Sequence, residues 1–425
     1  MRFGVFFPHQ MPRPWADGQE AKLFAGALEM VEIADRAGIA YAWAQEHHFL
    51  EEYSHSTAPE VFLGACSQRT RSIRLGHGVC VMPPAVNHPA RVAERIATLD
   101  LVSGGRVEWG TGEMSSRVEL EGFGINYVEK RAMWAEAVHE TAKMMSMTPY
   151  PGFEGKYFSM PSRNIVPKPI QKPHPPLWIA CTNRETLKYA ARLGAGALTF
   201  AFMDPTEARF WVEEYYEVFR RECHPIGRAV NPNVATLIGF SCSRDGERAR
   251  SAAQADQKFF KYGLAHYYRF GKHIPGRTHL WNEFESASDF PMAGLDGVGS
   301  PEELEPRFRA YEEAGVDQLI LLQQAGRADM SSICESLALF GAEVLPRFIE
   351  RDIALQRAKE ARLEPFIAQA MERITSVPSV DPPVVESYPS LWDKHSGQSH
   401  GEHASRAIEK TALWNLHVGG SRKER

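Results

Sequence analysis

The sequence lacks the features that mark several large classes of protein. Its 48 Lys and Arg residues are outnumbered by 53 Asp and Glu residues, and the net charge of -5 provides no basic field for nucleic acid or an anionic membrane. The apolar stretch before Pro8 is too short for a signal peptide core or a membrane span. We therefore expect a cytoplasmic protein with small molecules or proteins as partners, and neither nucleic acid nor a membrane among them.

Cysteine is scarce, and the chain has no metal-binding spacing. The 6 Cys residues stand singly, without a CxxC pair, and neither HxH nor HExxH occurs. This pattern fits a reducing compartment and predicts no bound metal. The first apolar run is not followed by GxGxxG, so the sequence has no dinucleotide-binding fingerprint of its own.

Eight apolar runs of strand length alternate with longer amphipathic segments. The chain has 425 residues, of which 44% are hydrophobic, which permits either about three domains or one large barrel. The order is strand then helix throughout, which predicts an α/β fold with a (β/α)8 TIM barrel over residues 1–350. A doubly wound open sheet is the alternative. The predicted strands are 2–7, 40–45, 73–79, 107–110, 177–181, 197–200, 234–241 and 318–322, and the clearest helices are 20–37, 89–101, 129–147, 184–193, 205–223 and 330–348.

Three segments depart from this alternation. Residues 148–176 and 259–298 lack simple periodicity and are predicted to be insertions in the barrel. Residues 351–425 are predicted to be a C-terminal extension or arm that packs on the barrel or on a second subunit, with disorder as the alternative. Within the second insertion, aromatic and imidazole side chains are candidates for a lid over the barrel opening: His266, Tyr267, Tyr268, His273 and Trp281.

The second predicted strand ends in WAQEHHF, which places His47 and His48 at the C-terminal rim of a barrel. Catalytic residues of this architecture come from that rim, and a free imidazole with a pKa of about 6.5 suits proton transfer near neutral pH. Adjacent residues at a strand end point to opposite sides, so one imidazole is expected to face the site and the other to pack. A structural rim cluster or half of a metal site are the alternatives.

Hydroxyl and guanidinium groups near later strands predict a phosphate site. Thr182, Asn183 and Thr186 follow the fifth strand where a helix begins, although Asn183 is equally well explained as an ordinary helix cap. Arg131 begins another helix, where it would bind a phosphate or pair with an acidic neighbour. Further candidates follow the fourth strand: Gly110, Gly112, Ser115, Ser116 and Arg117.

Aromatic side chains near the predicted rim are candidates for a substrate pocket, and their alternative role is the barrel core. They are Phe7, Trp43, Phe49, Trp109, Phe200 and Phe202.

Four ordered motifs resemble the bacterial luciferase family of flavin-dependent monooxygenases. They are WAQEHHF, then RLGHGVCVMPPAVNHPARVAERIATLDLVSGGRVEWGTG, then ELEGFGI with the following EKR, and PPLWIACTNRETLKYAARLGAG. The resemblance covers residues 1–350. It implies a barrel that takes reduced FMN from a separate NAD(P)H:flavin reductase and activates O2 as a flavin 4a-hydroperoxide. A small, mainly apolar organic substrate would then be oxygenated, and a homodimer is implied through helices near the second and third units.

The resemblance also implies roles for individual residues. His47 matches the family's catalytic histidine, with His48 as its supporting neighbour. The family's phosphate contacts match Arg131, Asn183 and Thr186, with Thr182 adjacent. A cis peptide beneath the flavin ring is implied between Gly78 and Val79.

The sequence departs from the luciferases after the fourth strand. Their reactive Cys and the Arg that follows it align with Gly112 and Glu113. Oxygenation is therefore expected in place of light emission, and Ser115, Ser116 or Arg117 is expected to replace the lost phosphate contact. Three alternatives stay open: hydride transfer with a reduced deazaflavin, non-catalytic flavin binding and, more distantly, a metal-dependent barrel hydrolase.

Overall fold

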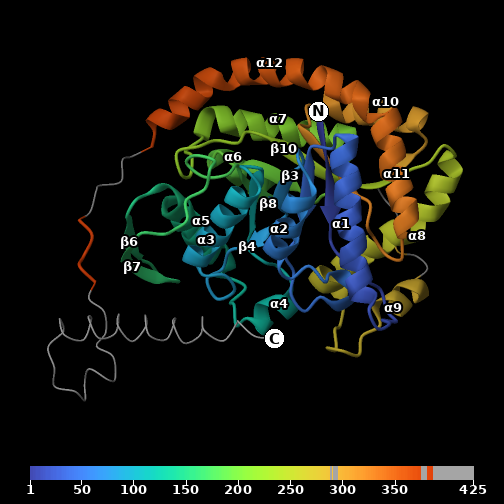
Figure 1. Ribbon diagram of the computed structural model, residues 1–425, viewed down its shortest axis with the longest axis horizontal. Helices are drawn as coiled ribbons and strands as arrows, with labels where there is room; N and C mark the ends of the chain where they lie inside the picture. The colour runs from blue at the N-terminus through green and yellow to red at the C-terminus, as the bar shows by residue number, and fades with distance from the viewer. Residues whose placement is uncertain (288–289, 291–294, 375–380, 386–425) are drawn as a thin grey trace, which may run out of the picture. The chain divides into compact units, whose positions relative to one another are not determined.

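The computed structural model describes residues 1–287, 290, 295–374 and 381–385. The chain divides into a compact unit from Met1 to Val380 and a second unit from Asp381 to Arg425. Nearly all of the second unit lies outside the described residues, so the fold described here is that of the first. Its parallel strands lie at the centre, with helices around them (Figure 1).

The eight predicted strands are confirmed, and they close into a barrel. Each strand pairs in parallel with the next, and β12 returns to pair with β1 through Gln318 and Arg2. This last pairing excludes the open-sheet alternative. The barrel strands are β1 (Arg2–Phe7), β2 (Tyr41–Ala44), β3 (Arg74–His77), β5 (Val107–Gly112), β8 (Leu177–Cys181), β9 (Gly196–Thr199), β10 (Val234–Cys242) and β12 (Gln318–Leu322).

Helices follow the strands and cover the barrel. The predicted helices at 20–37, 89–101, 129–147, 184–193 and 205–223 are confirmed to within one residue at each end. The described helices are α1 (Gln19–Ala37), α2 (Pro59–Arg69), α3 (Pro89–Val102), α4 (Arg117–Gly122), α5 (Lys130–Ser146), α6 (Arg184–Arg192), α7 (Pro205–Glu222), α8 (Gly246–Ala265), α9 (Leu280–Ser286), α10 (Pro301–Glu313), α11 (Met330–Glu343) and α12 (Leu345–Glu372), with the short turns η1 (Glu51–Tyr53) and η2 (His266–Phe270).

The two predicted insertions contain secondary structure. The first includes an antiparallel hairpin of β6 (Tyr150–Glu154) and β7 (Ser159–Arg163). The second predicted insertion, near 259–298, overlaps the end of α8, which continues to Ala265. Its start is capped by the Asp245 side chain, and the polar residues among its buried positions conceal the helical period in the sequence. Within this insertion, residues 288–289 and 291–294 lie outside the described residues. The short strands β4 (Cys80–Val81) and β11 (Gly297–Gly299) complete the sheet.

One long helix continues through residue 350, where the barrel domain was predicted to end. Helix α12 begins at Leu345, packs against α7 and buries Leu363 and Ala370 (Figure 1). The 330–348 prediction therefore spans two helices, which are separated at Val344. The rest of the predicted arm, at 375–380 and 386–425, lies outside the described residues.

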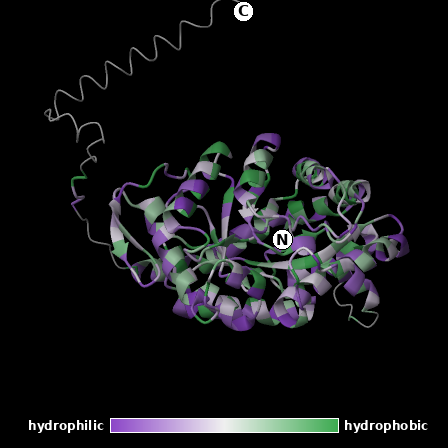
Figure 2. Ribbon diagram, turned by 90° about the horizontal axis from the view of Figure 1, so that it is seen from below, coloured by the Kyte–Doolittle hydropathy of each residue, from purple (hydrophilic) through white to green (hydrophobic). Residues whose placement is uncertain are grey.

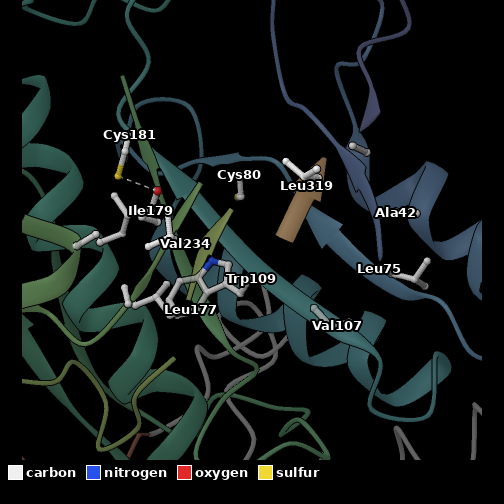
Figure 3. Close-up of a cluster of buried hydrophobic side chains, with 14 of the residues drawn as sticks. Ala42, Leu75, Cys80, Val107, Trp109, Leu177, Ile179, Cys181, Val234 and Leu319 are labelled. Atoms are coloured by element: carbon white, nitrogen blue, oxygen red, sulfur yellow. Dashed lines mark hydrogen bonds between the residues drawn. The ribbon is translucent and has the colours of Figure 1, made fainter. Parts of the chain in front are cut away.

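The strands bury both of their faces, in two separate clusters. Side chains that point into the barrel include Phe6, Trp43, Trp178, Leu198 and Ile320. Their neighbours along each strand, such as Leu75, Val107 and Leu177, belong to the outer cluster, which packs against the helices (Figure 3). Hydrophobic and hydrophilic colours alternate along the helices (Figure 2). The inner cluster continues past the strand ends, so the C-terminal opening of the barrel has aromatic walls.

Gly110 provides a test of this packing, because an added β-carbon there would overlap the carbonyl oxygen of His77. We expect Gly110→Ala to lower the free energy of unfolding by more than about 2 kcal/mol, since the obstacle is backbone inside a closed sheet. Gly64→Ala is the matched control: the site is open and helical, and the variant should be about 1 kcal/mol more stable. Thermal unfolding of both variants checks this, and equal melting temperatures would contradict it.

Candidate active site

His47 lies in the loop after β2 and is held by a buried carboxylate from α4. Its Nδ1 lies 3.0 Å from Oε1 of Glu119, whose side chain is fully buried. The backbone amide of His48 donates to the same oxygen at 3.0 Å. An acceptor at Nδ1 fixes the ring and places the proton of a neutral imidazole on that nitrogen. Nε2 then forms no hydrogen bond within the described part of the chain and is the atom available to a substrate.

Two phenol rings flank this imidazole. The ring of Tyr53 lies 5.6 Å from that of His47, and the ring of Tyr268 lies 6.4 Å away. Burial raises the pKa of both phenols above the ordinary value, and the negative charge of Glu119 adds to the effect. Both hydroxyl groups therefore stay protonated at neutral pH. Tyr268 is the predicted lid residue that the structure brings to His47.

His48 points away from His47 and supports the neighbouring strand. Its Nε2 lies 3.2 Å from Oε1 of Glu46, and this buried carboxylate also accepts from the amide of Val81 at 2.7 Å and from Nδ2 of Asn87 at 2.8 Å. These contacts tie the end of β2 to β4. His48 is placed as a support for the site, whereas the sequence did not identify Glu46, Asn87 or Glu119.

The predicted cis peptide between Gly78 and Val79 is confirmed. It lies between β3 and β4, next to Gly112 at the end of β5. A β-carbon on Gly112 would overlap the Val79 side chain, and one on Gly76 would overlap the ring of Trp43. The two glycines thus leave room for the side chains of Val79 and Trp43.

A compact cluster of charges forms where α5 and α6 begin. Nη2 of Arg131 donates to Oε1 of Glu113 at 2.7 Å and to Oγ1 of Thr186 at 3.3 Å. Nζ of Lys130 lies 3.3 Å from Oε2 of Glu113 and donates to Oγ of Ser115 at 3.1 Å. The hydrogen bond to Glu113 raises the pKa of Arg131, which stays charged. Both cations therefore contact the Glu113 carboxylate, and the hydroxyl groups of Thr186 and Ser115 lie beside them.

The other predicted phosphate residues have different positions. Asn183 caps α6, with Oδ1 accepting from the Thr186 amide at 2.9 Å, and Thr182 is exposed beside it. Arg117 does not join the cluster, because it is exposed and donates to Glu121 at 2.6 Å within its own helix. Ser116 is buried at the start of α4. Lys130 lies in the cluster where Arg117 was expected. Its position next to Arg131 in the EKR motif is the sequence feature that could have identified it.

The predicted pocket aromatics divide between the two faces of the strands. Trp43, Phe200 and Phe202 belong to the inner cluster, where Phe200 lies 5.8 Å from Phe6. The predictions for Phe7 and Trp109 are wrong: both lie in the outer layer, Phe7 against Phe62 of α2 and Trp109 beside Leu177 (Figure 3). Successive positions of a strand face opposite sides. Phe6 and Gly110 face the barrel interior, so the adjacent Phe7 and Trp109 face outward.

Phe49 covers α4 and is not part of the barrel interior. It is 50% exposed, and its ring lies 5.1 Å from that of Phe123. An added β-carbon at Gly122 would meet the Phe49 ring, so Gly122 allows this ring to lie close to the helix.

The lid candidates are packed onto the rim near His47. Buried Glu52 accepts hydrogen bonds from the amides of Leu280 and Trp281, and Nε2 of His273 lies 3.2 Å from Oε1 of Glu51. His266 and Tyr267 are buried in η2, which precedes these contacts. Two adjacent acidic residues of one rim turn thus hold the segment that carries Tyr268.

Within the described ranges, no group of three or more His, Cys, Asp or Glu side chains is arranged to hold a metal ion. None of the helices described is both long and apolar enough to cross a membrane.

Comparison with known proteins identifies relatives of the whole barrel. A family model described as luciferase-like monooxygenase matches residues 1–318. The oxygenase component of a flavin-dependent trigonelline monooxygenase from Acinetobacter baylyi is 25% identical over 84% of this chain and 98% of its own length. Limonene 1,2-monooxygenase from Rhodococcus erythropolis is 25% identical over 81% and 86%. A 5,10-methylenetetrahydromethanopterin reductase from Methanopyrus kandleri is 23% identical over 76% and 94%.

Solved structures share the fold. The monooxygenase RslO1 from Streptomyces bottropensis matches with a TM-score of 0.68 and 24% identity, over 82% of this chain and 100% of the other. The oxygenating constituent of 3,6-diketocamphane monooxygenase from Pseudomonas putida, in complex with FMN, matches with a TM-score of 0.64 and 19% identity, over 81% and 98%.

Proposed function

The chain belongs to the luciferase-like monooxygenase family, and we propose that it is the oxygenase of a two-component system that uses reduced FMN and O2 to oxygenate a small, mainly apolar organic molecule. The observation that carries the proposal is the pair of Glu119 and His47. A buried carboxylate orients an imidazole at the C-terminal end of a barrel, next to the rings of Tyr53 and Tyr268. The relative named as the oxygenase component of a flavin-dependent trigonelline monooxygenase supports this reading.

The residues present fit reduced FMN. Arg131, Lys130 and Thr186 form a donor set suited to a phosphate at the start of α6. The cis peptide before Val79 and the Val79 side chain, which lies next to Gly112 at the end of β5, would form an apolar surface beneath the flavin ring. Reduced FMN, when bound, supplies the electrons with which O2 is activated.

The chain's own residues would transfer a proton, donate hydrogen bonds and keep water away from the reaction. His47 would hold or deliver a proton at Nε2, with Glu119 keeping the ring oriented. The hydroxyl groups of Tyr53 and Tyr268 would donate hydrogen bonds beside it. The aromatic walls, including Phe6 and Phe200, would exclude water from the reacting oxygen.

A deazaflavin-dependent hydride transfer is the second candidate, because one relative is named as a methanopterin reductase. Titration of the purified protein with reduced FMN and with a reduced deazaflavin, both without oxygen, separates the two. We expect tight binding of reduced FMN. Tight binding of the deazaflavin alone would overturn the proposal. A substrate screen with reduced FMN, in which mass spectrometry detects products that gain one oxygen atom, then tests turnover.

Two partners belong to the proposal. A separate NAD(P)H:flavin reductase would supply the reduced FMN, so activity should require either that enzyme or chemically reduced FMN. A second copy of the chain would cover the exposed apolar side chains of α2 and α3, which include Val61, Leu101 and Val102. Light scattering of the purified protein should then give twice the mass of one chain.

Ser115 is expected to assist in phosphate binding through Lys130. Its hydroxyl fixes the ammonium group beside Glu113, so Ser115→Ala should raise the FMN dissociation constant about threefold to tenfold. Arg117→Ala should leave this constant unchanged, because that side chain is exposed and pairs with Glu121. Quenching of FMN fluorescence measures both. Unchanged affinity in Ser115→Ala would remove this residue from the site.

A further inference from the structure

Lys261 lies at the barrel opening, where its charged side chain is partly buried beside an aromatic ring. It is half-buried on α8, and its Nζ lies 4.7 Å from the centre of the Phe202 ring. Within the part of the chain that the structure describes, its ammonium group forms no ion pair. Burial lowers the pKa of this amine to about 8, while the charge of Asp296 acts in the opposite direction. The cation is therefore partly removed from water, and none of the described residues pairs with it at contact distance.

A continuous row of aromatic rings connects Lys261 to the candidate catalytic histidine. The ring of His47 lies 5.6 Å from that of Tyr53, which lies 5.3 Å from that of Phe260. Phe260 in turn lies 6.2 Å from Phe202, over which Nζ of Lys261 is placed. These residues come from the loop after β2, from α8 and from the loop after β9. Contacts within the inner aromatic cluster thus connect Lys261 to His47.

The groups around Lys261 explain why a ligand would be favoured there. Phe202 and Phe260 are apolar, and they attract a cation only weakly through the ring face. Asp296 is the charged group that acts on the amine, and its carboxylate also accepts from the hydroxyl of Tyr311 at 3.2 Å. A partly desolvated ammonium gains more from a contacting anion than an exposed one does. An apolar wall that carries one such cation is suited to an apolar molecule with one negative group.

We propose that Lys261 is a specificity-determining residue that binds a carboxylate of the substrate, so that the substrate class is an apolar or aromatic carboxylic acid. The inference rests on the proposed function for its biological meaning. Lys261 anchors the charged end, the partly buried ring of Phe202 contacts the apolar body, and the atom to be oxygenated extends toward His47.

The test compares matched acids and amides on the protein without flavin. The probes are benzoate, 1-naphthoate and octanoate, each beside its neutral carboxamide, and binding is followed by tryptophan fluorescence and calorimetry. At about pH 7, at least one acid should bind about tenfold more tightly than its amide, as a charge-assisted hydrogen bond predicts. This preference should fall as the pH rises through about 8, because the amine then loses its proton.

Three variants make the test specific. Lys261→Gln should lose the preference for the acid, whereas Lys258→Gln, one turn earlier on α8, should keep it. Lys261→Arg should keep the preference and hold it above the pH at which the wild type loses it, which also controls for folding. Equal binding of acids and amides to the wild type would overturn the proposal, as would a preference that survives in Lys261→Gln. Failure of the proposed function would instead appear as absent binding of reduced FMN, with the preference for acids intact.

Discussion

Replacing His47 by Gln lowers the rate of substrate oxygenation at least tenfold and leaves FMN binding nearly unchanged. This is the expected result because general acid–base catalysis by a positioned side chain contributes about 100-fold to 10,000-fold, and a glutamine side chain cannot exchange a proton near neutral pH. The phosphate cluster around Arg131 is formed by other segments and should be unaffected. Product formation is measured by mass spectrometry with an excess of reduced FMN, and FMN affinity is measured separately by fluorescence.

Two further variants show how His47 acts. Glu119→Gln keeps the shape of the side chain but removes the negative charge beside Nδ1, so it should lower kcat and change the pH profile without abolishing activity. His55→Gln is the matched control, because His55 pairs with Glu20 away from the site and should keep full activity. Full activity in His47→Gln would show that another group moves the proton. A wild-type protein that binds FMN but oxidises nothing in the screen would favour a flavin carrier.

The strand order was predictable because each barrel strand is a short apolar run between helices with clear periods. The same apolar character concealed which way the side chains point. In RFGVFF both Phe6 and Phe7 are fully buried, one inside the barrel and one against α2, so no polar residue indicates the phase. The prediction that Phe7 and Trp109 line the pocket failed for this reason. Helix α8 was partly missed because its buried face includes Gln257.

The candidate site was predictable where local motifs carry it and hidden where the fold assembles it. His47 and Arg131 stand in motifs that suggest their roles. Glu119 is separated from His47 by 72 residues, and the pairing of β2 with β3 and of β3 with β5 brings the segments that carry the two residues together. Glu113 was recognised as a departure from the luciferase pattern. Its contacts with Arg131 and Lys130 required the structure.

Replacing Arg131 by Met raises the FMN dissociation constant by about tenfold to 100-fold, which is the second large effect expected. Hydrogen bonds to a charged group contribute about 1.5 to 3 kcal/mol, and a guanidinium can form two of them with one phosphate. Riboflavin has the same ring system without the phosphate, so its affinity should change little. Arg184→Met is the matched control, because Arg184 stands at the start of α6, as Arg131 does at the start of α5, but pairs with Glu214.

The Glu113 carboxylate is expected to affect how tightly Arg131 and Lys130 bind the phosphate of FMN. In the structure its carboxylate forms ion pairs with Arg131 and Lys130. A phosphate must therefore displace this carboxylate or share the two cations with it. Removal of this negative charge by Glu113→Gln should therefore lower the FMN dissociation constant about threefold to tenfold, and riboflavin binding should stay the same. In the double variant with Arg131→Met most of this gain should disappear, because the released partner is then absent. Weaker FMN binding in Glu113→Gln would mean that the carboxylate orients Arg131 for the phosphate and does not compete with it.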